Sequence, residues 1–240
     1  TFYGDFQNDG SVESQGQLIF NSSTDVTLDL GDNFNSEGKV DFGGSGLITL
    51  AGDDPSFVNV EISNTNASGV SANSNWSLIN LSIDSGSVFN AGSYTHTIDG
   101  TWANTGDFNG GSSTVTFTSN DLSNEILGNG NNDFYNIVFD AGSELTVVTA
   151  LNIYGDYTDN GTDIDLSDAS LHFVGSSNAD INGTGNNAIG ELAINKSSSA
   201  RVLLNKSSEV GNFLTLESGA LDLNANTLTI NNGDVSAISR

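Results

Sequence analysis

The feature that most constrains this chain is a pattern of very short apolar alternations separated by turn residues. In residues 128–173, Tyr135, Ile137 and Phe139 stand at every second position, and the same spacing returns after each polar turn. A period of two residues is typical of strands with one buried face, whereas an amphipathic helix needs a period near 3.6. Because clusters of Gly, Asn, Asp and Ser interrupt every run, the pattern predicts an all-β fold of many short strands.

Related copies of this stretch occupy residues 183–230 and, less regularly, residues 52–98. The motif apolar-x-Asn/Glu-apolar-x-apolar begins at Phe57, Phe134 and Ile189, and it follows the polar turns GDDPS, GNGNND and GTGNNA. In each copy another strand is expected eight residues beyond the last apolar position, at Val70, Val147 and Val202. We therefore predict that these three strands are structurally equivalent, in a repeat built of coils of about 20 residues.

A parallel β-solenoid, or β-helix, is the fold that suits such strands. One coil alone buries too little apolar surface to offset the entropy lost on ordering it, so coils must stack. Right-handed winding is expected from the chirality of strand crossovers. The alternative is an antiparallel β-sandwich, since Asp9-Gly10 and Asn160-Gly161 are hairpin signals. We expect one domain over residues 1–240, continued by further repeats or covered by other domains, because neither end shows a cap against edge pairing.

Composition excludes several classes of partner. The chain has 30 acidic against five basic residues, a formal charge of −25, so binding to nucleic acid or to an anionic membrane is not expected. No apolar run is long enough for direct membrane insertion. Hydrophobic residues make up 36%, which is enough for a core. The absence of cysteine excludes disulfides and thiolate chemistry.

Candidate reactive groups do not converge in the sequence. Turn-forming carboxylates exposed to solvent are expected at three acidic pairs, Asp53/Asp54, Asp156/Asp159 and Asp163/Asp165. His96 and His172 are far apart, and both are expected to face solvent from the polar phase of a strand. We therefore predict that the chain is not an enzyme and has no catalytic, cofactor-binding or metal residues.

Three binding alternatives stay open at this point. The spacing from Gly128 to Asp133 is similar to a calcium-binding nonapeptide repeat, so Ca²⁺ is a possible cofactor without assigned ligands. Trp76 and Trp102 are expected in the core, with a sugar platform as the alternative. Outward threonines suggest an ice-binding face as a third alternative. Such a face needs threonines at the same position in successive coils, whereas these fall in different registers, at Thr95/Thr97, Thr114/Thr116/Thr118 and Thr227/Thr229.

Four phrases of the chain resemble the long β-solenoid repeats of Bacteroidota secreted surface proteins and adhesins of the type IX secretion cargo type. They lie at residues 4–10, 115–130, 134–141 and 221–230. The resemblance covers most of the chain and is one of repeat style, without a catalytic signature. It implies an extracellular, elongated, repetitive protein at the cell surface.

The expected function is thus a non-enzymatic structural or adhesin repeat segment, a stiff acidic spacer or surface-display module. Its expected partners are neighbouring repeats of the same or another chain and surface glycans. The alternative from another class is a β-helix that binds or cleaves polysaccharide, and a lesser one is an ice-binding or calcium-dependent adhesive module.

Overall fold

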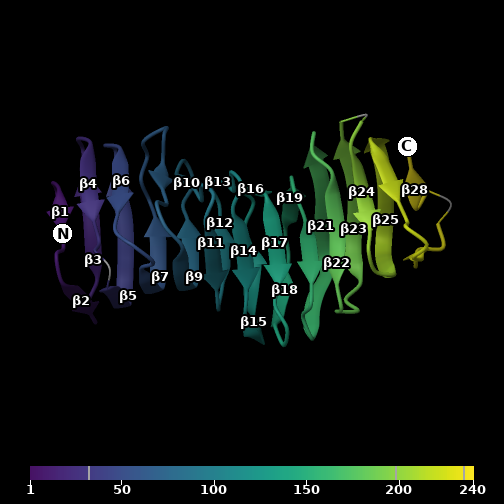
Figure 1. Ribbon diagram of the computed structural model, residues 1–240, viewed down its shortest axis with the longest axis horizontal. Helices are drawn as coiled ribbons and strands as arrows, with labels where there is room; N and C mark the ends of the chain where they lie inside the picture. The colour runs from purple at the N-terminus through teal and green to yellow at the C-terminus, as the bar shows by residue number, and fades with distance from the viewer. Residues whose placement is uncertain (32, 198, 235) are drawn as a thin grey trace. The chain divides into compact units, whose positions relative to one another are not determined.

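The computed structural model describes residues 1–31, 33–197, 199–234 and 236–240, and these residues form 28 strands and no helix (Figure 1). The strands build parallel sheets of stacked coils, a β-solenoid of about 11 turns over the described residues. The predicted fold class is therefore confirmed. The antiparallel sandwich is wrong, because partner strands run parallel throughout the pairings that define the coils.

The chain divides into two compact units. The first comprises Thr1–Val115 with Gly128–Asn132, and the second comprises Thr116–Leu127 with Asp133–Arg240. The single domain expected over residues 1–240 stays a prediction, and each unit is described by itself below.

The first unit contains thirteen complete strands among the described residues, most of them two to five residues long. They are β1 (Phe6–Gln7), β2 (Ser11–Ser14), β3 (Leu18–Ser22), β4 (Val26–Asp29), β5 (Asn33–Gly44), β6 (Ile48–Ala51), β7 (Ser56–Ile62), β8 (Val70–Ser71), β9 (Trp76–Ile83), β10 (Val88–Asn90), β11 (Thr95–Ile98), β12 (Trp102–Asn104) and β13 (Asp107–Asn109).

The remaining strands belong wholly or partly to the second unit. Two of them, β14 (Thr114–Phe117) and β16 (Asn131–Phe134), have residues in both units. The others are β15 (Asn120–Leu127), β17 (Asn136–Phe139), β18 (Glu144–Val147), β19 (Ala150–Ile153), β20 (Tyr157–Asp159), β21 (Asp163–Gly175), β22 (Ala179–Gly183), β23 (Ile189–Lys196), β24 (Arg201–Leu204), β25 (Ser208–Ser218), β26 (Ala220–Asp222), β27 (Leu228–Ile230) and β28 (Ile238–Ser239).

Each coil has three sides, and each side stacks on the same side of the next coil. In the first unit one stack runs β1–β4–β6–β8–β10–β13, and Figure 1 shows β4 and β6 side by side. Strands β5, β7 and β9 bend and supply two sides each, which is why β5 pairs with both β2 and β3. The bend in β5 coincides with a register shift between Ser36 and Lys39.

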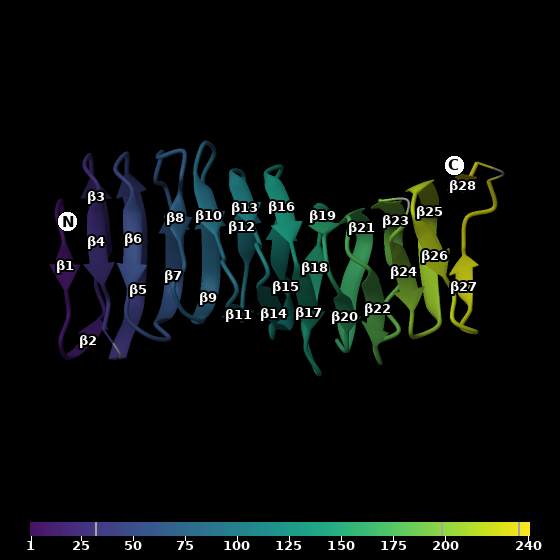
Figure 2. The ribbon, with the colours of Figure 1, turned by 45° about the horizontal axis from the view of Figure 1, so that its top comes forward.

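The second unit repeats this arrangement. One stack runs β17–β20–β22–β24–β26, and β21 bends so that it pairs with both β18 and β19. Strands β23 and β25, side by side in Figure 2, continue the stack that starts with β19 and β21. Partner residues are separated by 19 positions between Arg201 and Ala220 and by 24 between Tyr157 and Ile181. The predicted coil length of about 20 residues is confirmed.

Inward side chains form a continuous apolar core within each unit. In the first unit aromatic rings stack from coil to coil, with centroids 5.6 Å apart for Phe20 and Phe42, 5.8 Å for Phe42 and Trp76, and 5.0 Å for Trp76 and Phe89. Both tryptophans are 1% exposed, so Trp76 and Trp102 are core residues, as predicted. Such ring pairs add to the stabilisation that burial alone provides.

The predicted equivalence of the strands at Val70, Val147 and Val202 is wrong. Within the second unit, Val202 lies on β24, which belongs to the stack β17–β20–β22–β24–β26. Val147 lies on β18, which pairs with β21 outside that stack and so occupies another side of the coil. Val70 lies on β8 of the first unit. All three valines are buried, as the alternation predicts. Every side of a coil demands the same alternation, so the motif predicts a strand without specifying which side it occupies.

Asp9-Gly10 and Asn160-Gly161, which were interpreted as hairpin signals, instead form corners between parallel strands. The Gly10 amide donates to Asn8 Oδ1 at 3.1 Å, and the Gly161 amide donates to Asp159 Oδ1 at 3.1 Å. In both turns a side chain oxygen accepts from the backbone two residues later, as Asn and Asp commonly do.

Candidate functional site

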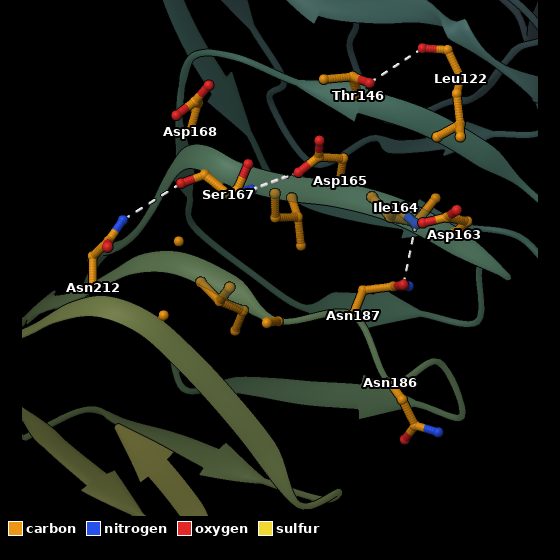
Figure 3. A pocket seen from close by; sticks show the side chains of 15 residues that line it. Leu122, Thr146, Asp163, Ile164, Asp165, Ser167, Asp168, Asn186, Asn187 and Asn212 are labelled. Carbon is orange, nitrogen blue, oxygen red and sulfur yellow. Dashed lines mark hydrogen bonds between the residues drawn. The ribbon is translucent and has the colours of Figure 1, made fainter. Parts of the chain in front are cut away.

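An open groove of about 880 Å³ lies in the second unit (Figure 3). It lies where β21 passes from one side of the coil to the next. Its lining consists of acidic, amide, hydroxyl, glycine and apolar residues, namely Leu122, Thr146, residues 163–168, residues 186–190, Gly211 and Asn212.

Side chains of β21 point alternately outward and into the core, so its polar residues face the groove. Asp163 and Asp165 are exposed, whereas Ile164 and Leu166 between and beyond them are buried. The carboxylate of Asp165 accepts from the Ser167 amide at 3.0 Å, and Figure 3 shows the two residues together. The Ser167 amide first, and its hydroxyl second, hold the pKa of Asp165 below its usual value. A general acid needs a raised pKa, so Asp165 is suited to accept hydrogen bonds and not to donate a proton.

Two amide side chains hold the groove in shape. Asn187 Oδ1 accepts from the Ile164 amide at 3.1 Å, and Asn212 Nδ2 donates to the Ser167 carbonyl at 3.5 Å (Figure 3). The Asn212 amide and the exposed carboxylates of β21 can bond a ligand that carries hydroxyl groups, while Leu122 adds an exposed apolar surface.

A buried charged cluster adjoins the groove at Asn187. Asp159, which is 1% exposed, accepts from Lys206 Nζ at 3.1 Å through Oδ2 and from Asn187 Nδ2 at 3.0 Å through Oδ1. Lys206 also donates to the Gly185 carbonyl. We expected Asp159 to be a solvated turn residue, and the structure overturns this. Lys206 stands 47 positions away in sequence, and only the stacking of coils brings it to the carboxylate.

The first unit contains a neutral counterpart of this corner. The Gly106 amide donates to Asn104 Oδ1 at 3.0 Å, and the Gly130 amide donates to the Asn104 carbonyl at 2.9 Å. Asn132 Oδ1 accepts from Asn104 Nδ2 at 2.9 Å and from Trp102 Nε1 at 3.0 Å. The turn GNGNN thus places its last asparagine against a buried polar side chain of the preceding coil.

The turn GTGNN of the second unit has the same geometry. The Gly161 amide donates to the Asp159 side chain, and the Gly185 amide donates to the Asp159 carbonyl at 2.9 Å. Asn187, the last residue of the turn, bonds the Asp159 carboxylate. The two corners therefore share one backbone pattern, and the second differs in carrying a carboxylate and a lysine. This shared Gly-x-Gly-x-Asn spacing is the sequence signal that relates the two corners.

The other predicted acidic pairs lie in hydrogen-bonded turns. Asp53 and Asp54 are exposed, and Asp54 Oδ1 accepts from Asn75 Nδ2 at 3.1 Å. Asp156 Oδ1 accepts from the Asp180 amide at 2.8 Å. These carboxylates bond their neighbours in the stack, as turn residues of a repeat protein are expected to do.

One of the two histidines faces outward from its strand, and the other faces the core. His172 is half-buried on the outer side of β21, between buried Leu171 and Phe173, as predicted. His96, which was expected in solvent, is 2% exposed and points inward in the same phase as Ile98. Its Nε2 donates to the Ala91 carbonyl at 3.0 Å, so its Nδ1 is free to accept from the Trp76 amide at 3.3 Å. Both ring nitrogens are used inside the core.

Acidification is expected to weaken the fold through His96. Burial lowers the pKa of His96 below 6.5, and the Ala91 carbonyl opposes this only partly. The folded protein then binds the proton less tightly than the unfolded chain, so stability is lost as pH falls below about 6.5. We expect His96→Asn to reduce the loss of unfolding free energy between about pH 7.5 and about pH 5, as measured by urea titration. If His172→Asn reduced it equally, the effect would not come from burial.

A second buried titratable group, Lys196, bonds through Nζ to the Tyr154 carbonyl at 2.7 Å. Burial lowers the pKa of Lys196 from 10.5 to about 8, against the raising effect of Asp156. The unfolded chain therefore binds more protons between these values, and stability rises with pH above about 8. We expect this rise, up to about 1.4 kcal/mol per pH unit, to vanish in Lys196→Met. Urea titrations up to about pH 9.5, below the ordinary tyrosine pKa, will show it.

The residues considered for calcium and ice have ordinary roles in the fold. Asp133 Oδ1 accepts from Asn152 Nδ2 at 2.8 Å. Among the described residues, no group of three or more His, Cys, Asp or Glu is placed to hold a metal ion. The threonines at 95, 97, 114, 116, 118, 227 and 229 are exposed or half-exposed, and those at 118 and 227 lie outside the strands.

Comparisons with known proteins add no assignment. No protein-family model matches the sequence, and neither the curated proteins nor the solved structures include a match. Within the part of the chain that the structure covers, no helix has the length and apolar character to cross a membrane.

Proposed function

We propose that this chain is a non-enzymatic structural repeat module of an extracellular surface protein, serving as an acidic spacer or display segment. Its partners are neighbouring repeats and, at the surface, glycans. The resemblance to secreted Bacteroidota repeats supports this location, and the way the chain uses its polar side chains supports this role.

The observation that carries this proposal is that polar side chains bond from coil to coil. In the first unit Asn80 Nδ2 donates to Asn59 Oδ1 at 2.9 Å. In the second unit Asn205 Nδ2 donates to Asn182 Oδ1 at 2.9 Å, and Asn224 Nδ2 donates to Asn205 Oδ1 at 3.1 Å. Side chains arranged in this way strengthen the stack, which supports a mechanical role.

Removing one coil tests the spacer role. Ser56 pairs with Ser77, so deletion of residues 56–76 joins equivalent positions of successive coils. When the chain links a cell anchor to a fluorescent reporter, we expect the deletion to fold and to shorten the anchor-to-reporter distance by about one strand spacing, ~4.8 Å. A distance that stays unchanged would contradict the spacer, and turnover of a polysaccharide at enzymatic rates would contradict the non-enzymatic role.

A second candidate function is glycan binding in the groove of the second unit. It is favoured by the combination of Asp165, whose pKa is lowered, the Asn212 amide and an apolar rim. A neutral glycan panel would detect it. We expect Asp168→Ala and Asn212→Ala to abolish a genuine signal, whereas Asp53→Ala, an exposed acidic change in the first unit, should leave it intact. A signal lost equally in all three variants would not come from the groove.

A further inference from the structure

The corner at Asp159 holds three reactive groups from three parts of the second unit. Asp159 ends β20, Asn187 precedes β23, and Lys206 follows β24. One carboxylate joins them, with Lys206 Nζ on Oδ2 at 3.1 Å and Asn187 Nδ2 on Oδ1 at 3.0 Å. The lysine side chain passes the turn at residues 183–187, whose Gly185 carbonyl also accepts from Nζ. An amine and a carboxamide are thus held against a shared proton acceptor.

The carbonyl of Asn187 is also polarised. Its Oδ1 accepts from the Ile164 amide at 3.1 Å, so a backbone donor already lies where negative charge would develop if a nucleophile attacked the amide carbon. Donors placed in this way stabilise the oxyanion of acyl transfer. The surroundings exclude most water, because the Asp159 side chain is 1% exposed and that of Lys206 is 12% exposed.

We propose that Lys206 and Asn187 form an intramolecular isopeptide bond, with Asp159 as the proton carrier. The Lys206 ammonium gives a proton to Asp159, and the resulting amine attacks Cγ of Asn187. The new bond is Nζ–Cγ, and the bond that breaks is Cγ–Nδ2. Of the two protons that leave Nζ, one passes through Asp159 to the departing nitrogen, which leaves as ammonia, and the other goes to solvent. No oxidant or other reactant is needed.

The local structure provides an exit for the ammonia. A hollow of about 220 Å³, lined by Lys206, Asn187 and Ser208 among others, opens beside the cluster. The neutral corner of the first unit has Asn104 in the place of Asp159, and this amide is not a proton acceptor of comparable strength. The bond goes beyond the spacer role by linking successive coils of the second unit covalently.

Intact-mass measurement of the purified full chain tests the proposal. We expect the folded protein to be lighter than its sequence by one molecule of ammonia. A chain of full sequence mass would overturn the proposal. A loss of one water would also overturn it, because that product joins Lys206 to the Asp159 carboxyl instead.

Matched variants separate the bond from other ammonia losses. Each of the five Asn-Gly sequences can lose ammonia by forming a succinimide, and Lys206→Arg keeps all five, at Asn109, Asn129, Asn160, Asn182 and Asn232, together with the charge pair. We expect Lys206→Arg and Asp159→Asn, which mimics the neutral corner, to have full sequence mass. Circular dichroism will confirm that they fold. An ammonia loss that persists in Lys206→Arg would overturn the proposal.

Proteolysis of the denatured protein locates the bond. Cleavage after lysine and arginine separates residues 40–196 from residues 202–206 in an unlinked chain. If the bond exists, Lys206 resists cleavage and residues 202–240 remain attached to residues 40–196 through Asn187. Recovery of free residues 202–206 from the wild-type chain at full yield would overturn the proposal.

Discussion

Gly183→Ala is expected to lower the unfolding free energy by about 4 kcal/mol or more, which is exceptional for the addition of one methyl group. Gly183 ends β22 with φ +112°, a conformation that side chains disfavour, and an added Cβ would lie 1.9 Å from the Asp159 carbonyl oxygen. That oxygen is backbone in a paired strand, so it cannot move aside cheaply. Urea unfolding followed by circular dichroism measures the loss.

Gly142→Ala provides the matched control in the same unit. Gly142 has φ +86°, yet no atom lies within 4 Å of the added Cβ. Only the backbone strain remains, and we expect a loss of about 1 kcal/mol. Similar losses in the two variants would show that the close approach of coils at Gly183 contributes nothing.

Trp76→Ala is expected to lower the unfolding free energy of the first unit by about 3–5 kcal/mol. The Trp76 ring is 1% exposed, and its centroid lies 5.3 Å from that of Phe57 and 5.0 Å from that of Phe89. Truncation therefore leaves a cavity between coils on either side, and the stack cannot collapse around it without breaking strand pairs. Urea unfolding will report the loss, with hydrogen exchange assigning it to the first unit.

Tyr3→Ala serves as the control for loss of an aromatic ring. Tyr3 is 70% exposed in the same unit, so we expect its removal to change the unfolding free energy by less than about 0.5 kcal/mol. If Trp76→Ala were as mild as Tyr3→Ala, the ring stack would not be a stabilising core.

Much of the fold could be predicted because its cause is local. Alternation at Ile137 and Phe139 indicates a strand wherever it occurs, and both residues are buried. The prediction that His96 faces solvent was based on its polarity and is wrong. His96 stands two positions before Ile98, so alternation along the strand places both side chains inward. The buried ring is tolerated since Ala91 and Trp76 satisfy both nitrogens.

The candidate sites were less predictable because they depend on register. The exposure of Asp165 was predicted, but its expected place in a turn is wrong because it lies within β21. The groove beside it also needs Asn187 and Asn212, which come from later coils. The Asp159–Lys206 pair joins residues 47 positions apart, and no local sequence pattern predicts it. The repeated Gly-x-Gly-x-Asn turn is the one signal that links the two corners.

The sequence by itself predicted an all-β chain of short strands in stacked coils of about 20 residues, because period-two burial and frequent turns act within a few residues of each other. It left an antiparallel sandwich as the alternative, and the structure decided for parallel pairing. Only the tertiary structure decided which side of a coil each strand occupies, where His96 points, and which lysine meets which carboxylate. Coil lengths vary between 19 and 24 residues, so small differences in the turns accumulate along the stack and set which distant side chains meet.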